Sequence, residues 1–276
     1  MNIISLSPLD LAVATSIMLA YAGLTFALRL QLGTQLLISA ARAFLQLLLI
    51  GFVLETLFEH DRLIWVALMA LVMLLTASRE AVRRQTHKFH GLWGILFGSS
   101  TMFVVSFTIT LIALTVIISH DPWYEPRYAV PVLGMMLGNT MNGISLGMER
   151  LTTTAWQQRN IIENRLMLAQ TWNQAISDVR RSAIHSGLIP IINAMSVAGI
   201  VSLPGMMTGQ ILAGNAPMQA VKYQILIFFL IASSVGFSTI AAVFLASRYL
   251  FDHRQRLRLD RLRHPKTRKQ SPRKPD

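Results

Sequence analysis

Long apolar runs alternate with short polar segments along nearly the whole chain. A helix needs about twenty apolar residues to cross the hydrocarbon core of a bilayer. Only helices or closed barrels satisfy their own backbone groups in lipid. The pattern therefore predicts an all-α polytopic membrane protein of about seven transmembrane helices, at residues 8–28, 33–58, 63–78, 91–119, 128–148, 188–212 and 221–247.

Three of these runs differ from an ordinary transmembrane segment. The third is short, the fourth is long enough to tilt or break, and the sixth contains Pro190 and Pro204. Proline removes a backbone donor and clashes with the preceding turn, so it kinks or ends a helix. Whether the sixth run forms one helix or two pieces stays open at this point.

Lys and Arg residues gather in alternate connecting segments. The segments that follow the first, third, fifth and seventh runs hold Arg29, four residues from Arg79 to Lys88, five from Arg150 to Arg181 and the eleven of the tail. The other segments hold only Arg62, Arg127 and Lys222. Cytoplasmic loops are enriched in Lys and Arg, so the N-terminus is predicted outside and the C-terminus in the cytoplasm. The predicted organisation is a transmembrane domain at residues 1–247, with a cytoplasmic segment at 149–187, and a basic cytoplasmic tail at 248–276.

Composition and charge support a membrane location. Hydrophobic residues make up 53% of the chain and charged residues 14%, against roughly a quarter charged in soluble domains. The chain has no cysteine, which excludes disulfides and thiolate metal sites. Eleven of the 25 Lys and Arg residues behind the net charge of +12 lie in the tail. We therefore expect contact with anionic membrane lipids and no nucleic acid, and a largely disordered tail beyond His264.

The cytoplasmic segment has the periodicity of an amphipathic helix. Apolar residues recur every three or four positions on one face, at Ile162, Leu166, Ala169, Trp172, Ile176, Val179 and Ala183. Such a helix can lie flat at the membrane interface or dock on a partner protein. Periodicity alone does not separate these alternatives.

The same segment resembles the cytoplasmic coupling loop of ABC transporter permeases. The similarity runs from Glu163 through Leu166, Leu168 and Ala175 and ends at a later Pro190. Ala169 stands where that family usually has glycine, which leaves room for continuous helix in place of a turn. By this resemblance the helix that couples to an ATPase would comprise Glu163, Leu166, Leu168, Ala169, Trp172, Ala175 and Ile176.

Two flanking stretches carry a more specific resemblance. Residues 131–147 and 203–214, with a Met-Met-Thr-Gly-Gln run at 206–210, resemble the FetB family of bacterial iron-export permeases, which has plant relatives linked to aluminium tolerance. The resemblance implies a permease subunit that exports iron or another metal and pairs with a separate ATPase subunit. The chain has no Gly-x-x-x-x-Gly-Lys-Ser/Thr loop, so we expect no cofactor here, no enzyme activity, and ATP bound by the partner.

Polar and helix-breaking residues within the runs are candidates for the translocation path. They are Arg42, Asn139, Asn142, Asn193, Pro204, Met206, Met207 and Gln210, because polar groups in lipid must face a partner helix or a wet path. Gly134, Gly138, Gly143 and Gly147 are predicted to serve helix packing. Methionine can bind soft metals or fill gaps, and the histidines form no cluster, so no metal site is predicted.

We therefore interpret the chain as the membrane half of a metal-exporting ABC transporter that works as a homodimer with a separate ATPase. A self-sufficient carrier or channel is the first alternative, although only Glu55 resembles the intramembrane acids such proteins use. An intramembrane enzyme is less favoured, since no paired acids or activated nucleophile are visible.

Overall fold

The computed structural model describes residues 7–30, 32–59, 62–91 and 93–263. Within them the chain is helical, with only isolated β-bridges beside the helices, so the predicted all-α class is confirmed. Among the described residues, five helices are long and apolar enough to cross a membrane: α1 (Pro8–Ala27), α2 (Gly33–Glu59), α3 (Leu63–Arg83), α4 (Trp93–Ile112) with its π-helical extension η1 (Ala113–Ile118), and α10 (Pro217–Tyr249). The count of seven crossings and the orientation stay predictions.

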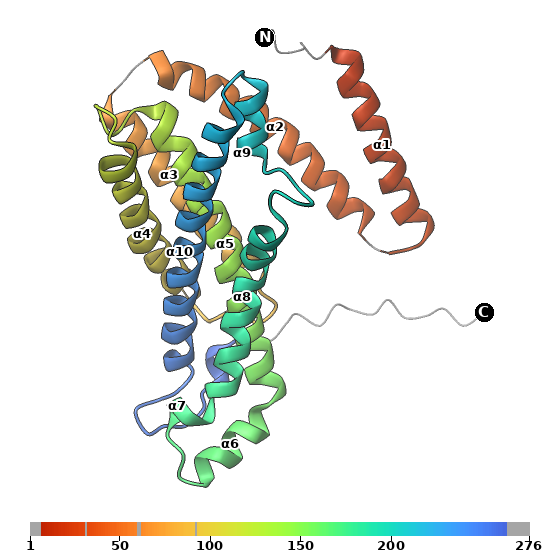
Figure 1. Ribbon diagram of the computed structural model, residues 1–276. Coiled ribbons are helices and arrows are strands. Elements are labelled where there is room, and N and C mark those ends of the chain that lie inside the picture. The colour runs from red at the N-terminus through yellow and green to blue at the C-terminus, as the bar shows by residue number, and fades with distance from the viewer. Residues whose placement is uncertain (1–6, 31, 60–61, 92, 264–276) are drawn as a thin grey trace, which may run out of the picture.

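Helix α5 (Pro126–Gln157) is the central element of the bundle. It packs against α3, α4, α8 (Ser177–Val197) and α10, as Figure 1 shows. Pro126 occupies the first turn, where proline's missing N–H costs nothing. The helix continues beyond the predicted end at residue 148, because its last turns still bury Leu151 and Ala155 in the main core.

Helices α1 and α2 stand apart from this bundle. In Figure 1, α1 lies to one side and contacts the rest through α2, which crosses the bundle obliquely. Few residues of either helix are buried. Because their exposed side chains are mostly apolar, these two helices have the surface expected of elements that face lipid or another polypeptide.

The sixth apolar run is broken in the structure, which answers the question that the sequence left open. Helix α8 ends at Val197, and α9 (Gly205–Leu212) begins after a turn that includes Gly199 at a φ of 82°. Pro190 lies inside α8, whereas Pro204 caps α9. A positive φ is accessible to glycine without a Cβ clash, so Gly199 permits the turn between the two helices.

The segment predicted to be cytoplasmic also breaks where continuous helix was one possibility. Helix α6 (Arg159–Met167) is separated from α7 (Trp172–Ala175) by a turn, and Ala169 has a φ of 61°. Thus alanine adopts the left-handed conformation that usually favours glycine. The turn is closed by Gln170 N–H donating to the Arg165 carbonyl at 3.1 Å and by a capping box at Thr171 and Gln174.

The beginning of the basic tail, before the stretch where disorder was predicted, is folded. Residues 250–262, which we call the C-terminal strap and which include the short helix η2 (Leu259–Arg261), return to the bundle and bury Leu250, Phe251 and Leu262. Leu262 forms an antiparallel bridge with Phe89 in the connection between α3 and α4. These apolar side chains gain enough burial to order a strongly basic stretch. Residues 264–276, where disorder was expected, lie outside the described residues.

Candidate functional site

The turn between α6 and α7 lies at one end of the bundle, the end predicted to be cytoplasmic, and contains the residues with the coupling-loop resemblance (Figure 1). Ala175 and Ile176 are fully buried beneath it, and Leu166 packs against the same core. Met167 and Leu168, by contrast, are 76% and 77% exposed. The structure therefore presents an apolar pair on a turn whose base is anchored, which we call the coupling tip.

The C-terminal strap and the end of α10 hold the coupling tip from one side. Trp172 N–H donates to Gln255 Oε1 at 2.9 Å. The Trp172 ring lies 5.2 Å from the Arg248 guanidinium and 6.0 Å from the Phe251 ring. These contacts join α7 to the end of α10, the longest helix among the described residues.

Charged contacts fix the other side of the tip. Arg165 donates to Asp178 Oδ2 at 2.7 Å and to the Ala175 carbonyl at 3.3 Å. Arg180 lies over the Phe244 ring of α10 at 4.3 Å, and burial lowers the pKa of its guanidinium. Glu163 is exposed and lies on the outer surface of α6. The tip thus has charge at its rim and apolar side chains at its apex.

The four glycines of α5 have two different environments. A Cβ on Gly143 would lie 2.7 Å from Val235 Cγ1, and one on Gly147 would lie 3.1 Å from Thr239 Cγ2, so both sit at close contacts with α10. Gly138 has no neighbour within 4 Å of such a Cβ, and Gly134 meets only the Met73 side chain. The first pair lies at helix contacts, and the second pair lines an open cleft.

The two asparagines of α5 are both hydrogen-bonded. Asn139 Nδ2 donates to the Met135 carbonyl of its own helix at 2.8 Å, and Asn142 Oδ1 accepts from Arg84 at 2.8 Å. Burial of an amide in lipid is costly without such partners. The Arg84 contact places Asn142 at the junction of α3 and α5.

Residues of the broken span do not converge on one point. Asn193 is exposed on α8, Pro204 caps α9, and Met206 packs against the core between α5, α8 and α10. Met207 is half-buried, and Gln210 Oε1 is buried with no hydrogen-bond partner in the described residues. A buried amide without a hydrogen-bond partner costs free energy. Of this set, Gln210 is therefore the residue best suited to bind a polar group.

A separate group of hydroxyls joins three helices inside the bundle. Ser234 of α10 lies 3.1 Å from Ser106 of α4 and 3.0 Å from Thr140 of α5, measured between hydroxyl oxygens, and all three are fully buried. Interhelical hydroxyl contacts of this kind stabilise helix packing in membranes. Sequence reasoning missed this group, because single Ser and Thr residues in apolar runs give little signal.

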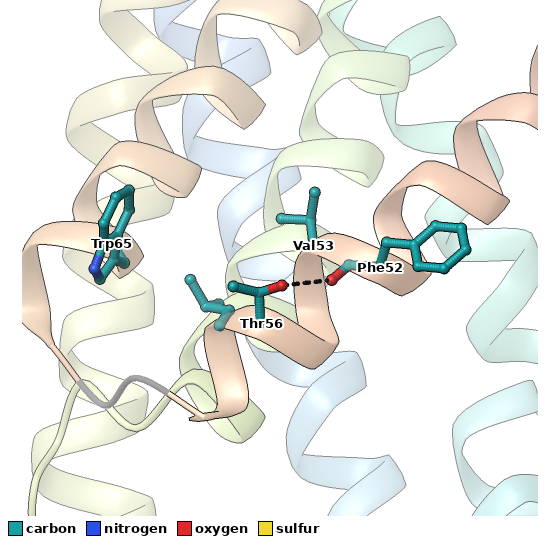
Figure 2. Close-up of a pocket in the computed structure, with 5 residues that line it drawn as sticks. Phe52, Val53, Thr56 and Trp65 are labelled. Atoms are coloured by element: carbon teal, nitrogen blue, oxygen red, sulfur yellow. Dashed lines mark hydrogen bonds between the residues drawn. The ribbon is translucent and has the colours of Figure 1, made fainter.

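An apolar pocket lies at the other end of the molecule. It has a volume of about 460 Å³ and is lined by Phe52, Val53, Thr56, Leu57 and Trp65. Figure 2 shows that the Thr56 hydroxyl donates to the Phe52 carbonyl at 3.1 Å, within the same helix. The lining is suited to hydrocarbon. Among the described residues, no three His, Asp or Glu side chains gather to hold a metal ion.

A family comparison shows where this chain belongs. The model of UPF0014, described as an uncharacterised protein family, matches residues 8–251. The chain belongs to the UPF0014 family. The match runs from α1 to the beginning of the C-terminal strap and so includes the coupling tip. No solved structure matches the chain.

Curated UPF0014 relatives are similar over most of their length. A membrane protein of Synechocystis sp., slr1647, is 42% identical over 83% of this chain and 87% of the relative. The probable iron export permease protein FetB of Escherichia coli is 32% identical over 85% and 88%. The protein ALUMINUM SENSITIVE 3 of Arabidopsis thaliana is 31% identical over 85% and 84%. The resemblance to the iron-export permeases and their plant relatives is thus confirmed.

The support of the coupling tip by the strap is the functional feature that sequence reasoning missed in this UPF0014 protein. Disorder was expected only beyond His264, where Pro, Lys, Arg and Ser predominate, and no structure was predicted for the residues from 248 to that point. The available signal was the recurrence of Leu250, Phe251, Leu257 and Leu262 among these charges. This spacing matches no regular helix or strand. The role of these apolar residues is therefore visible only in the structure, where the strap contacts Phe89 and Trp172.

Proposed function

We propose that this UPF0014 protein is the membrane-spanning permease subunit of an ABC transporter, which exports iron or another metal across the cell inner membrane. The permease works as a homodimer with two copies of a separate ATPase subunit, and that subunit binds ATP. The cargo and direction are suggested by the name of the Escherichia coli relative, a probable iron export permease. The alternative is a self-sufficient carrier, and the experiment below distinguishes it from an ABC permease.

One observation carries the proposal: the coupling tip is apolar, exposed and rigidly supported. Met167 and Leu168 leave most of their surface uncovered, while Trp172 and Ile176 anchor the turn behind them. A few buried apolar anchors supply most of the binding energy of a protein interface. The coupling tip fits a groove on the ATPase subunit. Because the tip is anchored, closure of the ATPase moves α5, α8 and α10.

The test is co-purification of the permease with its ATPase subunit, followed by transport in vesicles. Leu168→Glu places a charge at the apex and should reduce ATPase retention by about tenfold or more, the usual effect of a lost interface anchor. Leu168→Met keeps the apolar surface and serves as the matched control. ATP-dependent iron movement should be lost with the first variant and kept with the second.

Two results would contradict the proposal. The first is a permease that retains no ATPase subunit and moves metal without ATP, which would make it a carrier. The second is full ATPase retention and transport by Leu168→Glu, which would remove the coupling role of the tip. Comparing iron, zinc, copper and an organic chelate in the same vesicles identifies the cargo.

A further inference from the structure

An open cleft of about 680 Å³ lies between α2, α3 and α5, near the end of α3 that is predicted to face the cytoplasm. It is separate from the coupling tip and from the apolar pocket of Figure 2. Its polar lining consists of Arg42, Gln46, Thr76, Arg79, Glu80 and Arg83. Three guanidinium groups therefore share the cleft with a single carboxylate.

That carboxylate is already engaged by the arginines at the end of α3. Glu80 lies 4.0 Å from Arg83 and 3.7 Å from Arg84, and Arg84 is also held by Asn142. Arg42 and Arg79 have no ion pair or hydrogen bond among the described residues. The cleft consequently has two uncompensated positive charges on facing helices, α2 and α3.

Arg42 lies within the second apolar run, and Arg79 lies just past the end of the third. An uncompensated arginine at membrane depth is costly, and the usual compensation is an anion or water. Guanidinium groups bind phosphate and carboxylate with particular strength, because their paired N–H donors match two oxygens at once. A bare metal cation would be repelled by the same charges. The electrostatics of the cleft thus select an anionic group.

The wall formed by α5 leaves room for such a group. Gly134 and Gly138 line the cleft, and a Cβ on Gly138 would meet nothing within 4 Å. Leu137, Met73 and Met141 add apolar surface beside the arginines. The cleft therefore combines a basic rim with an apolar wall, which suits an anionic head attached to an organic body.

We propose that this cleft is a binding site for a phosphate or carboxylate group, held by Arg42 and Arg79. An anionic phospholipid of the cytoplasmic leaflet and a soluble organic anion both supply that chemistry. If the soluble anion is a metal chelate, the cleft becomes part of the cargo path. Binding to the permease alone needs no ATPase, so the proposal can fail or succeed independently of the transport function.

The experiment uses the full chain in nanodiscs. In one arm, discs of neutral phosphatidylcholine contain a small fraction of phosphatidylglycerol, and native mass spectrometry counts the retained anionic lipid. In the other arm, citrate and inorganic phosphate are titrated against discs of pure phosphatidylcholine. The variants are Arg42→Gln with Arg79→Gln, Gly138→Met to fill the cleft, and Arg181→Gln as a control that removes one positive charge from the exposed surface of α8.

At least one probe should bind the unchanged protein, and the double variant should weaken that binding about tenfold or more, as expected for lost charge-assisted hydrogen bonds. Gly138→Met should weaken it by obstruction while all charges remain, and Arg181→Gln should leave it unchanged. If the double variant does not fold, the proposal is tested by comparing probe binding between Gly138→Met and Arg181→Gln. The proposal is overturned if neither probe binds, or if the cleft variants bind as well as Arg181→Gln.

Discussion

At the scale of single residues, Gly187 of α8 and Gly143 of α5 lie at a close contact between helices of the bundle. A Cβ built on Gly187 would lie 2.6 Å from the Gly143 carbonyl oxygen and 2.7 Å from Thr239 Cγ2. The first of these atoms belongs to a helix backbone and cannot move aside as a flexible side chain would. The helices α5, α8 and α10 can therefore approach this closely only if residue 187 has no side chain.

Gly187→Ala is expected to destabilise the protein by about 1–3 kcal/mol, since overpacking a tight contact forces backbone shifts. The measurement is the thermal unfolding midpoint in detergent. Gly236→Ala is the matched control, because a Cβ there meets nothing within 4 Å in the interior of α10, and alanine favours helix over glycine. Equal midpoints for the two variants would show that the α5–α8 contact is not tight.

The coupling tip shows how far residue patterns could predict the site. The periodicity placed Trp172 and Ile176 on an apolar face, and the structure buries Ile176 and half-buries Trp172. It could not predict the left-handed turn at Ala169, because alanine carries no turn signal. A left-handed alanine costs roughly 1–2 kcal/mol. The hydrogen bonds of Ala169 and Gln170 to the end of α6 and the cap at Thr171 offset that cost.

At the scale of elements, the C-terminal strap depends on one carboxylate. Asp252 accepts hydrogen bonds from the backbone N–H groups of Arg254 and Arg256 and from Arg256 Nε, each at 2.9 Å. The Arg256 backbone hydrogen bond is the main cause that lowers the pKa of Asp252 to about 2. The ionised carboxylate closes the loop that brings Gln255 to Trp172.

Asp252→Asn should loosen the strap at neutral pH, because the amide loses the charge on which these bonds depend. The folded protein favours ionised Asp252, so its stabilising effect is complete above the ordinary pKa near 4 and disappears as the pH falls toward 2. The difference in unfolding midpoint between the unchanged protein and the variant should be constant from pH 7 to 5 and shrink between 4 and 2.

Asp260→Asn provides the comparison within the same strap. Asp260 is largely exposed and pairs with Arg258 at 2.8 Å, and exposed ion pairs contribute little to stability. This variant should change the midpoint less than Asp252→Asn at every pH. An equal or larger effect of Asp260→Asn would show that the strap is held by general charge balance and not by the closed loop at Asp252.

The elements themselves could be predicted to different degrees. Helices α1, α2 and α10 begin and end within a few residues of the apolar runs, because the span of the hydrocarbon dictates their length. Helix α5 extends nine residues past its run, since burial against other helices continues beyond the apolar stretch. Hydropathy contains no information about such protein contacts. The strap could not be predicted for the same reason, because it is ordered by contacts with the bundle.

At the scale of the whole molecule, the bundle has two distinct ends. The coupling tip and the strap occupy one end, and the connection between η1 and α5, with Trp123 and the contact of His120 with Glu125, occupies the other. The distribution of Lys and Arg predicts that the first end is cytoplasmic. An ATPase in the cytoplasm can reach the coupling tip only in that orientation.

The absence of cysteine from the chain makes this orientation directly measurable. Leu168→Cys and Trp123→Cys each introduce one thiol, at side chains that are 77% and 41% exposed. A membrane-impermeant maleimide should label Trp123→Cys in intact spheroplasts and label Leu168→Cys only after the membrane is opened. The reverse pattern would place Met167 and Leu168 outside the cell, where no ATPase could dock on them. The coupling mechanism would then be wrong, although the helical bundle and the charge of the cleft would be unchanged.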